Sequence, residues 1–249
     1  MAADNVNGAT QHRPPILDAW VVPLVAEGVG VLALCFAGIG AVMAFSQPLG
    51  GEAVTGGNLV GIALAEGLAY GLMVAAAGHI AGGLYNPAVT LGLLIVGRLR
   101  WQRAAAFVAA QLVGAVIGAL LIKASFPATA VDAVNLGTPA IPDTIATGRG
   151  VVAEIVGAFL LMYVIVGTVI DARGPKTIAP LVIGLTITID ILAFGPVTGP
   201  TVNPARWFGP AVLQASWDDW WVYWVGPGIG AAIAAILYYY IYLQGQGET

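Results

Sequence analysis

The chain has 249 residues, of which 59% are hydrophobic and only 9% charged, and its net charge is −4. Soluble domains carry about 25% charged residues, so this chain lacks the side chains for an ordinary aqueous surface and is predicted to be a polytopic membrane protein. No basic run points to nucleic acid. The sequence contains no Ser-His-Asp set, phosphate loop or metal-ligand spacing, so we expect no enzyme, no cofactor and no metal.

Six apolar runs are long enough to cross a membrane, because a ~30 Å hydrocarbon core requires ~20 helical residues. These predicted spans are 23–45, 59–80, 104–126, 151–170, 178–194 and 220–243. Two further runs, 87–96 and 204–213, have ten residues each. At ~1.5 Å per residue, each reaches ~15 Å. They are therefore predicted to enter the membrane without crossing it.

Each short run begins with the same tripeptide, Asn86-Pro87-Ala88 in the first and Asn203-Pro204-Ala205 in the second. Proline suits the first position of a helix, and asparagine is a favoured N-cap. We therefore predict two half-helices that start midway through hydrophobic surroundings. Their positive dipole ends and their two asparagine amides would point at one place.

The two halves of the chain also resemble each other. Ala26-Glu27-Gly28-Val29-Gly30 in the first span is matched by Ala153-Glu154-Ile155-Val156-Gly157 in the fourth. Three spans per half is an odd number, so the second half must be inverted, and the half-helices enter from opposite faces. The expected segments are an N-terminal tail (1–22), a first half-repeat (23–126) with a re-entrant helix (86–97), an outer loop (127–149), a second half-repeat (150–243) with a re-entrant helix (203–213), and a C-terminal tail (244–249).

Basic residues predict the orientation, because cytoplasmic loops carry an excess of Lys and Arg. With both termini in the cytoplasm, six basic residues fall inside and two outside. The inner ones are Arg13, Arg98, Arg100, Arg103, Arg173 and Lys176, and the outer ones are Lys123 and Arg149.

These motifs resemble those of the aquaporin, or major intrinsic protein, family over nearly the whole chain. Gly78-His79-Ile80-Ala81-Gly82 before the first tripeptide, and Arg206 with Phe208-Gly209-Pro210 after the second, are highly specific to it. The resemblance implies an all-α membrane protein with six transmembrane helices, two re-entrant half-helices and an inverted 3+3 repeat. It also implies a homotetramer with a separate pore in each subunit. We expect this pore to pass water and the protein to lie in the plasma membrane. At the pore centre, formed by both tripeptides, the asparagine amides would orient water and interrupt proton conduction.

Four positions resemble water channels more than glycerol channels. Glycerol-conducting members usually carry Asp at the place of Trp207, a basic residue at Ala211, and a Pro-aliphatic pair at Tyr223 and Trp224. Taken alone, Tyr223 and Trp224 fit an aromatic belt at the membrane interface as well as they fit the water-channel pattern. Small neutral solutes stay as further candidates beside water.

By the same resemblance, the outer selectivity filter falls on Glu66, Ile191, Pro200 and Arg206. Ile191 replaces a usual His, as in plant vacuolar-membrane members that also pass other small neutral solutes. Glu66 departs from the family pattern, and an acidic residue at membrane depth calls for a functional hypothesis. Facing the pore, Glu66 would pair with Arg206. The pair would cancel part of the Arg206 charge barrier and narrow the opening, or hold Arg206 in place, and acid would release it. A purely structural pair, or a helix rotated so that Glu66 contacts loop backbone, is the alternative.

Other polar residues lie inside the predicted spans. Glu27 and Glu154 are expected to accept hydrogen bonds from the backbone of the inserted loops, where exposed N–H groups would be costly. Asp190 is expected to pair with a neighbouring loop or helix, and Gln111 to join two helices. His79, at the inner end of the second span, fits an inner vestibule and a structural role equally well.

Three rival functions stay open. One is a channel mainly for glycerol, ammonia, urea or hydrogen peroxide. Another is a proton-coupled carrier that uses Glu66, Glu27 or Asp190, which saturable, pH-driven uptake would identify. The last is a scaffold that retains the fold and does not conduct.

Overall fold

The computed structural model describes residues 17–46, 56–199 and 201–244. Over these residues the secondary structure is helical, with no strand. The principal helices are α1 (Val22–Ser46), α2 (Gly56–Ala81), α3 (Pro87–Ile95), α4 (Trp101–Ser125), α5 (Ala128–Ala133), α6 (Thr147–Ile165), α7 (Ala179–Thr198), α8 (Pro204–Gln214) and α9 (Val222–Tyr238). Short π-helical or 3₁₀ segments accompany them: η1 (Leu17–Val21), η2 (Asn135–Gly137), η3 (Val166–Ile170), η4 (Lys176–Ile178) and η5 (Tyr239–Leu243).

All six predicted spans are present as helices long and apolar enough to cross a membrane. With their short extensions they are Ala19–Phe45, Asn58–Ala81, Trp101–Ser125, Thr147–Ile170, Lys176–Thr198 and Val222–Leu243. The fifth span was predicted to end at Phe194, but α7 continues through Pro196 to Thr198 and ends at Gly199 in a left-handed conformation. The expected outer loop contains a short helix, α5, that the sequence pattern did not predict.

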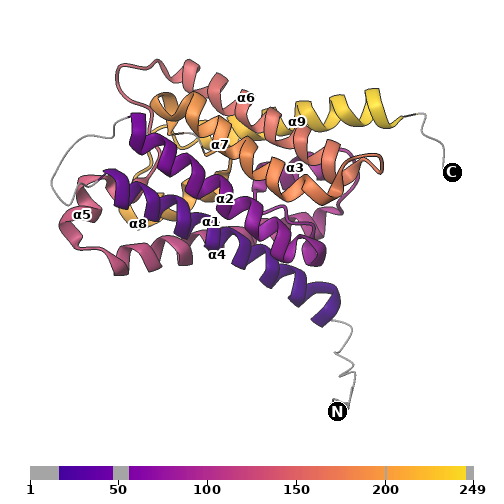
Figure 1. The fold of residues 1–249 in the computed structure, drawn as a ribbon, viewed down its shortest axis with the longest axis horizontal. Helices are drawn as coiled ribbons and strands as arrows, with labels where there is room; N and C mark the ends of the chain where they lie inside the picture. Colours follow the sequence, from indigo (N-terminus) through magenta and orange to yellow (C-terminus); the bar gives the residue numbers. More distant parts are fainter. Residues whose placement is uncertain (1–16, 47–55, 200, 245–249) are drawn as a thin grey trace, which may run out of the picture.

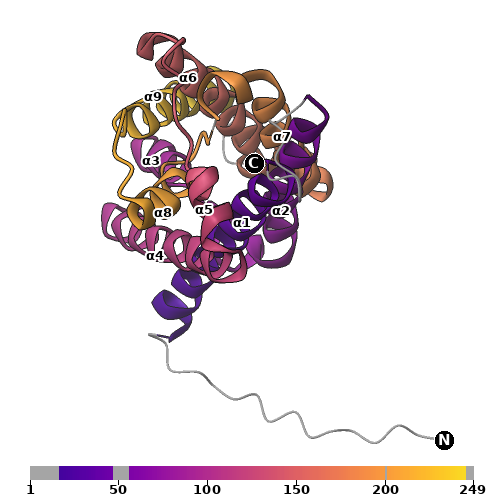
Figure 2. The same ribbon diagram turned by 90° about the vertical axis from the view of Figure 1, so that its left-hand side faces the viewer.

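The two short helices lie between α4 and α9 and complete a ring with the six long ones (Figures 1 and 2). Helices α1, α2 and α4 come from the first half of the chain, and α6, α7 and α9 come from the second. Within each half, α1 packs on α2 and α4, while α6 packs on α7 and α9. Helices α2 and α7 join the two halves on one side of the ring. Large apolar side chains on the outside, such as Leu72, Val113 and Ile241, are more than half exposed, as expected for a surface that faces lipid.

The two short helices are exchanged between the halves. Helix α3, from the first half, packs mainly on α9 of the second, and α8, from the second half, packs mainly on α4 of the first. Figure 2 shows this arrangement, with α3 beside α9 and α8 beside α4. The exchange brings the N-termini of α3 and α8 together in the interior.

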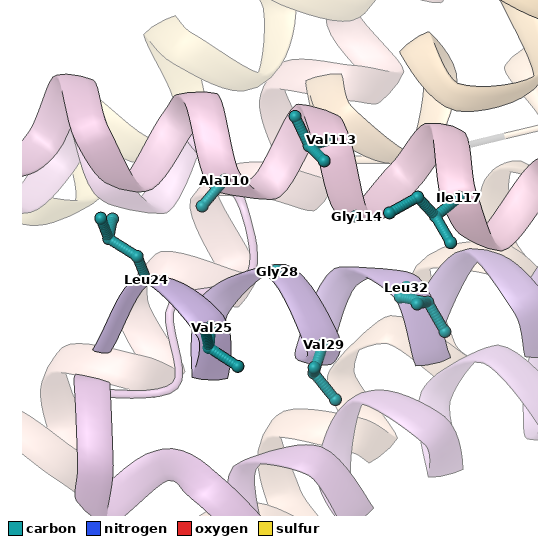
Figure 3. Close-up of a pocket in the computed structure, with 9 residues that line it drawn as sticks. All are labelled: Leu24, Val25, Gly28, Val29, Leu32, Ala110, Val113, Gly114 and Ile117. Carbon is teal, nitrogen blue, oxygen red and sulfur yellow. The ribbon is translucent and has the colours of Figure 1, made fainter. Parts of the chain in front are cut away.

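Glycines set the closest helix contacts. A Cβ at Gly114 of α4 would overlap the carbonyl oxygen of Gly28 on α1, and one at Gly118 would lie 2.5 Å from the Leu32 carbonyl oxygen. Figure 3 shows α1 and α4 side by side at this crossing, where a shallow apolar groove of about 320 Å³ opens on the surface. In the other half, a Cβ at Gly230 of α9 would overlap the Ile155 carbonyl oxygen on α6. The Gly-x-x-x-Gly pairs Gly114/Gly118 and Gly226/Gly230 therefore serve helix contacts within the subunit.

Candidate functional site

Both tripeptides form the predicted helix starts. Asn86 caps α3, and its Oδ1 accepts the Ala88 N–H at 2.8 Å. Asn203 caps α8 in the same way, with its Oδ1 3.0 Å from the Ala205 nitrogen. The following prolines occupy the first turn, where a missing N–H leaves no intrahelical bond unmade.

The two asparagines also bind across the interior, each to the loop that holds the other. Nδ2 of Asn86 donates to the Val202 carbonyl at 2.8 Å, and Nδ2 of Asn203 donates to the Tyr85 carbonyl at 2.9 Å. Both asparagines are almost fully buried. A carboxamide nitrogen carries two hydrogens, so each amide has a second N–H beyond this exchange.

The residue before each asparagine has a strained backbone. Tyr85 has φ of 45° and Val202 has φ of 43°, in the left-handed region where a β-branched residue is a genuine outlier. These two residues supply the carbonyl groups that the opposite asparagines bind. Such strain persists only where the surrounding structure enforces it, and it concentrates at functional sites. The sequence contains no signal for it, because neither residue is a glycine or an asparagine.

Glu27 and Glu154 hold these loops from behind, as predicted. The Glu27 carboxylate accepts the N–H groups of Leu84 at 3.0 Å and Tyr85 at 2.8 Å. The Glu154 carboxylate accepts those of Thr201 at 3.3 Å and Val202 at 2.9 Å. Both carboxylates are fully buried. Their oxygens accept hydrogen bonds from loop N–H groups that have no partner within a helix.

Two more side chains support the first loop. Gln111 on α4 donates to Glu27 Oε2 at 2.8 Å and to Thr90 Oγ1 at 3.1 Å, which confirms its predicted role in joining helices. The Tyr70 hydroxyl donates to the Leu84 carbonyl, a contact that the sequence pattern did not predict. On the second loop, the corresponding support is the Tyr223 hydroxyl, 2.9 Å from the Thr198 carbonyl.

Tyr223 is therefore an interior residue, and the aromatic-belt alternative is wrong for it. Its side chain is fully buried and stacks on Trp207, with ring centroids 5.6 Å apart and planes 10° apart. Trp217 packs edge-on against Trp207 from the other side, at 5.8 Å. Trp224 is half-buried and packs against the same cluster.

Glu66 and Arg206 form a buried ion pair. Arg206 Nε lies 3.2 Å from Glu66 Oε1, and both residues are 3% exposed. Arg206 Nη1 is also 3.5 Å from the Gly137 carbonyl oxygen in η2. The pair joins α8 to α2, as expected both for a Glu66 that faces the pore and for a purely structural pair.

The other predicted residues have different surroundings. Ile191 is buried on α7, whereas His79 is exposed in the last turn of α2. Pro200 lies outside the described residues. Asp190 is 1% exposed, and neither of its carboxylate oxygens has a hydrogen-bond partner among the residues that the structure describes. The expected pairing of Asp190 is therefore absent there. Its carboxyl group lies against Gly157 of α6, and the nearby Val202 N–H binds Glu154 instead.

One charged cluster lies just outside the spans, where η3 ends. Asp171 is buried and accepts hydrogen bonds from Arg173 through Nε at 2.9 Å and Nη2 at 2.6 Å, and from the Tyr238 hydroxyl at 3.2 Å. Arg173 Nη2 also donates to the Tyr242 carbonyl at 3.3 Å. The hydrogen bonds from Arg173 hold the pKa of Asp171 well below its usual range. This cluster fastens the connection between α6 and α7 to the end of α9.

The sequence comparison decides the family. The model for the major intrinsic protein family matches residues 19–238. The chain belongs to this family. Aquaporin TIP4-4 of Zea mays is 39% identical over 244 residues, which cover 96% of this chain and 94% of the relative. A probable aquaporin TIP1-2 of Oryza sativa subsp. japonica is 40% identical over 221 residues, 88% of this chain and 86% of the relative.

A solved structure agrees on the fold. The aquaglyceroporin of Plasmodium falciparum superposes with a TM-score of 0.78, covering 89% of this chain and 96% of its own, at 23% identity. The protein is therefore an integral membrane protein of the aquaporin fold, with six transmembrane helices and two half-helices. Members of this family are passive channels for water and small solutes and are not enzymes. The expectations of a passive channel and of a protein without enzyme activity are therefore confirmed.

Proposed function

We propose that this channel conducts water and excludes protons and ions at the paired Asn-Pro-Ala motifs. The reciprocal hydrogen bonds of Asn86 and Asn203 carry this proposal, since they hold two half-helix N-termini and two amide groups against each other in the interior. Each N-terminus is equivalent to about half a positive charge. A cation at this point is repelled by both helix ends, whereas a neutral molecule is not.

Water would pass this point in a fixed orientation. The remaining N–H of each asparagine donates to the oxygen of a passing water, whose hydrogens then point away on both sides. Neighbouring waters in the file are oriented oppositely and cannot relay a proton through the centre. The buried carboxylates of Glu27 and Glu154 take no part in transport in this proposal, because the loop N–H groups occupy them.

The outer filter belongs to the same proposal. Glu66, Ile191, Pro200 and Arg206 form it, and Ile191 adds an apolar wall that admits small neutral solutes beside water. His79 is assigned to the inner vestibule, which agrees with its exposed position at the end of α2. We also propose a homotetramer with both termini in the cytoplasm.

The membrane is a separate question. From the sequence we expect the plasma membrane, whereas the relatives named TIP, which align along most of the chain, favour a vacuolar one. Fluorescent tagging of the chain in its own cells, with markers of both membranes, distinguishes them.

Stopped-flow light scattering of proteoliposomes tests the function. We expect faster osmotic shrinkage than in protein-free vesicles, with a lower activation energy and a linear dependence on the gradient. A pH-sensitive dye inside the vesicles should report no added proton flux. Saturable uptake driven by a pH gradient would instead identify a proton-coupled carrier, and folded protein without any flux would identify a scaffold.

A further inference from the structure

Three elements hold the Arg206 guanidinium. Glu66 on α2 faces its Nε at 3.2 Å, the Gly137 carbonyl in η2 accepts from its Nη1 at 3.5 Å, and the backbone of α1 lies against it at Gly38. Glu66 and Arg206 are both 3% exposed. The positive side chain at the outer constriction is therefore neutralised and fixed against one wall.

Gly38 provides the space for this pair. A Cβ at position 38 would overlap Glu66 Oε2 and lie 3.0 Å from Arg206 Nε. Any larger residue on α1 at this point would displace the carboxylate, the guanidinium or both. The pair thus depends on Gly38, an uncharged residue on a third helix.

We propose that Glu66 is a specificity-determining residue of the channel and that it acts by positioning Arg206. The inference rests on the proposed channel function and names the solutes of the same site. With Arg206 drawn to the wall, the constriction has no net charge and more room than one into which a free guanidinium extends. The solutes that gain are neutral molecules of the size of glycerol or urea, which carry several polar groups.

The chemistry of the pair fits such solutes. A guanidinium has five N–H groups, of which one faces Glu66 and one donates to Gly137. The others stay available for a hydroxyl or carbonyl oxygen, while Glu66 provides acceptor oxygens for a solute O–H or N–H. Ile191, buried on α7, is predicted to give this filter its apolar side.

The test compares the ratio of glycerol to water permeability in proteoliposomes. We expect wild type to conduct both solutes, and Glu66→Gln to lower the ratio several-fold while it still conducts water, because the unpaired guanidinium leaves the wall. Gly38→Ala should lower the ratio in the same direction with both charged residues present. Gly40→Ala is the matched control on α1, since its Cβ would meet only the end of the Ile122 side chain, at 3.1 Å, and its ratio should equal that of wild type.

A double variant tests whether Glu66 acts through Arg206. Arg206→Val should raise the ratio, and Glu66→Gln/Arg206→Val should match Arg206→Val alone. If the two substitutions change the permeability ratio independently, so that their effects multiply in the double variant, the proposal is overturned. Wild-type ratios in both Glu66→Gln and Gly38→Ala would overturn it as well. If Glu66→Gln does not fold, Gly38→Ala decides. Wild-type protein that conducts no water would refute the proposed channel function itself, a result separate from any change in the ratio.

Discussion

At the scale of single residues, Glu27 connects more of the interior than its place in the sequence suggests. Its two oxygens bind the N–H groups of Leu84 and Tyr85 and the amide of Gln111. These donors are shielded from bulk solvent, because all four residues are almost fully buried. The carboxylate therefore contributes by satisfying donors that would otherwise be left unbonded in a low-dielectric interior.

Removing this carboxylate should be costly. An unsatisfied buried donor costs about 1–3 kcal/mol, so Glu27→Ala, which strands three donor groups, should destabilise the fold by about 3 kcal/mol or more. Glu27→Gln keeps one acceptor oxygen and should cost less. Thermal unfolding in detergent, followed by circular dichroism, measures both. Equal melting temperatures for wild type and Glu27→Ala would contradict this account.

Asp171 gives a prediction about pH. The hydrogen bonds from Arg173 lower its pKa in the folded state, so its stabilising effect is present above the ordinary Asp pKa of about 3.9 and is lost as the pH falls through the lowered value. Asp171→Asn should therefore melt below wild type at pH 7, and the difference should shrink as the pH falls below about 4. A difference in melting temperature that stays constant between pH 7 and pH 3 would refute the stabilising role of the ionised Asp171. Tyr240→Phe is a suitable control, because Tyr240 is 54% exposed and its ring packs edge-on against Tyr239.

At the scale of elements, the crossing of α1 and α4 depends on the absence of side chains. Overpacking a tight contact costs about 1–3 kcal/mol. Gly114→Ala places a Cβ on the Gly28 carbonyl oxygen, so it should destabilise the fold by about that amount. Gly148→Ala in the first turn of α6 is the matched control, since a Cβ there meets nothing within 4 Å. The control should be neutral or slightly stabilising, because alanine favours a helix over glycine. Comparable losses of stability in Gly114→Ala and Gly148→Ala would show that the crossing does not need Gly114.

The elements were largely predictable from sequence, and the reasons are local. Runs of apolar residues identify the six spans, and Asn-Pro at the start of a short run identifies α3 and α8. The end of α7 was misplaced because Gly195-Pro196 is typical of a helix end, yet Pro196 lies in the last turn. Helix α5 is a six-residue segment, too short to show a period.

The contacts at the site were predictable where the repeat made two residues equivalent, or where a polar residue at membrane depth needed a partner, as for Glu66 with Arg206. Glu27 and Glu154 share a motif, so one role explained both. Gly38 and Tyr70 belong to no motif that recurs in the other half of the chain, so no pattern predicted their contacts with Glu66 and with the Leu84 carbonyl. The strained backbone of Tyr85 and Val202 arises from the meeting of two loops, which no local pattern encodes.

At the scale of the whole molecule, the outer surface suits lipid or another copy of the chain. On α2, Val60, Leu64, Leu68 and Leu72 follow one another at intervals of four and are all exposed. In the proposed homotetramer, each copy of 25.4 kDa retains its own interior. Light scattering of the detergent complex should give a protein mass about four times that of one chain, in line with the common closed symmetries. A conducting monomer would rule out assembly as a requirement for function.

The exchange of hydrogen bonds between Asn86 and Asn203 has a consequence for biosynthesis. The ribosome finishes residues 1–126 long before it makes Val202 and Asn203. Until then, the Asn86 amide and the Tyr85 carbonyl lack their final partners, and α3 lacks α9, its main neighbour. A half-inserted chain therefore cannot complete its first re-entrant loop, and that loop must stay open, or be shielded by the insertion machinery, until the second half arrives. Both exchanged hydrogen bonds of the centre can form only after the second loop is in place.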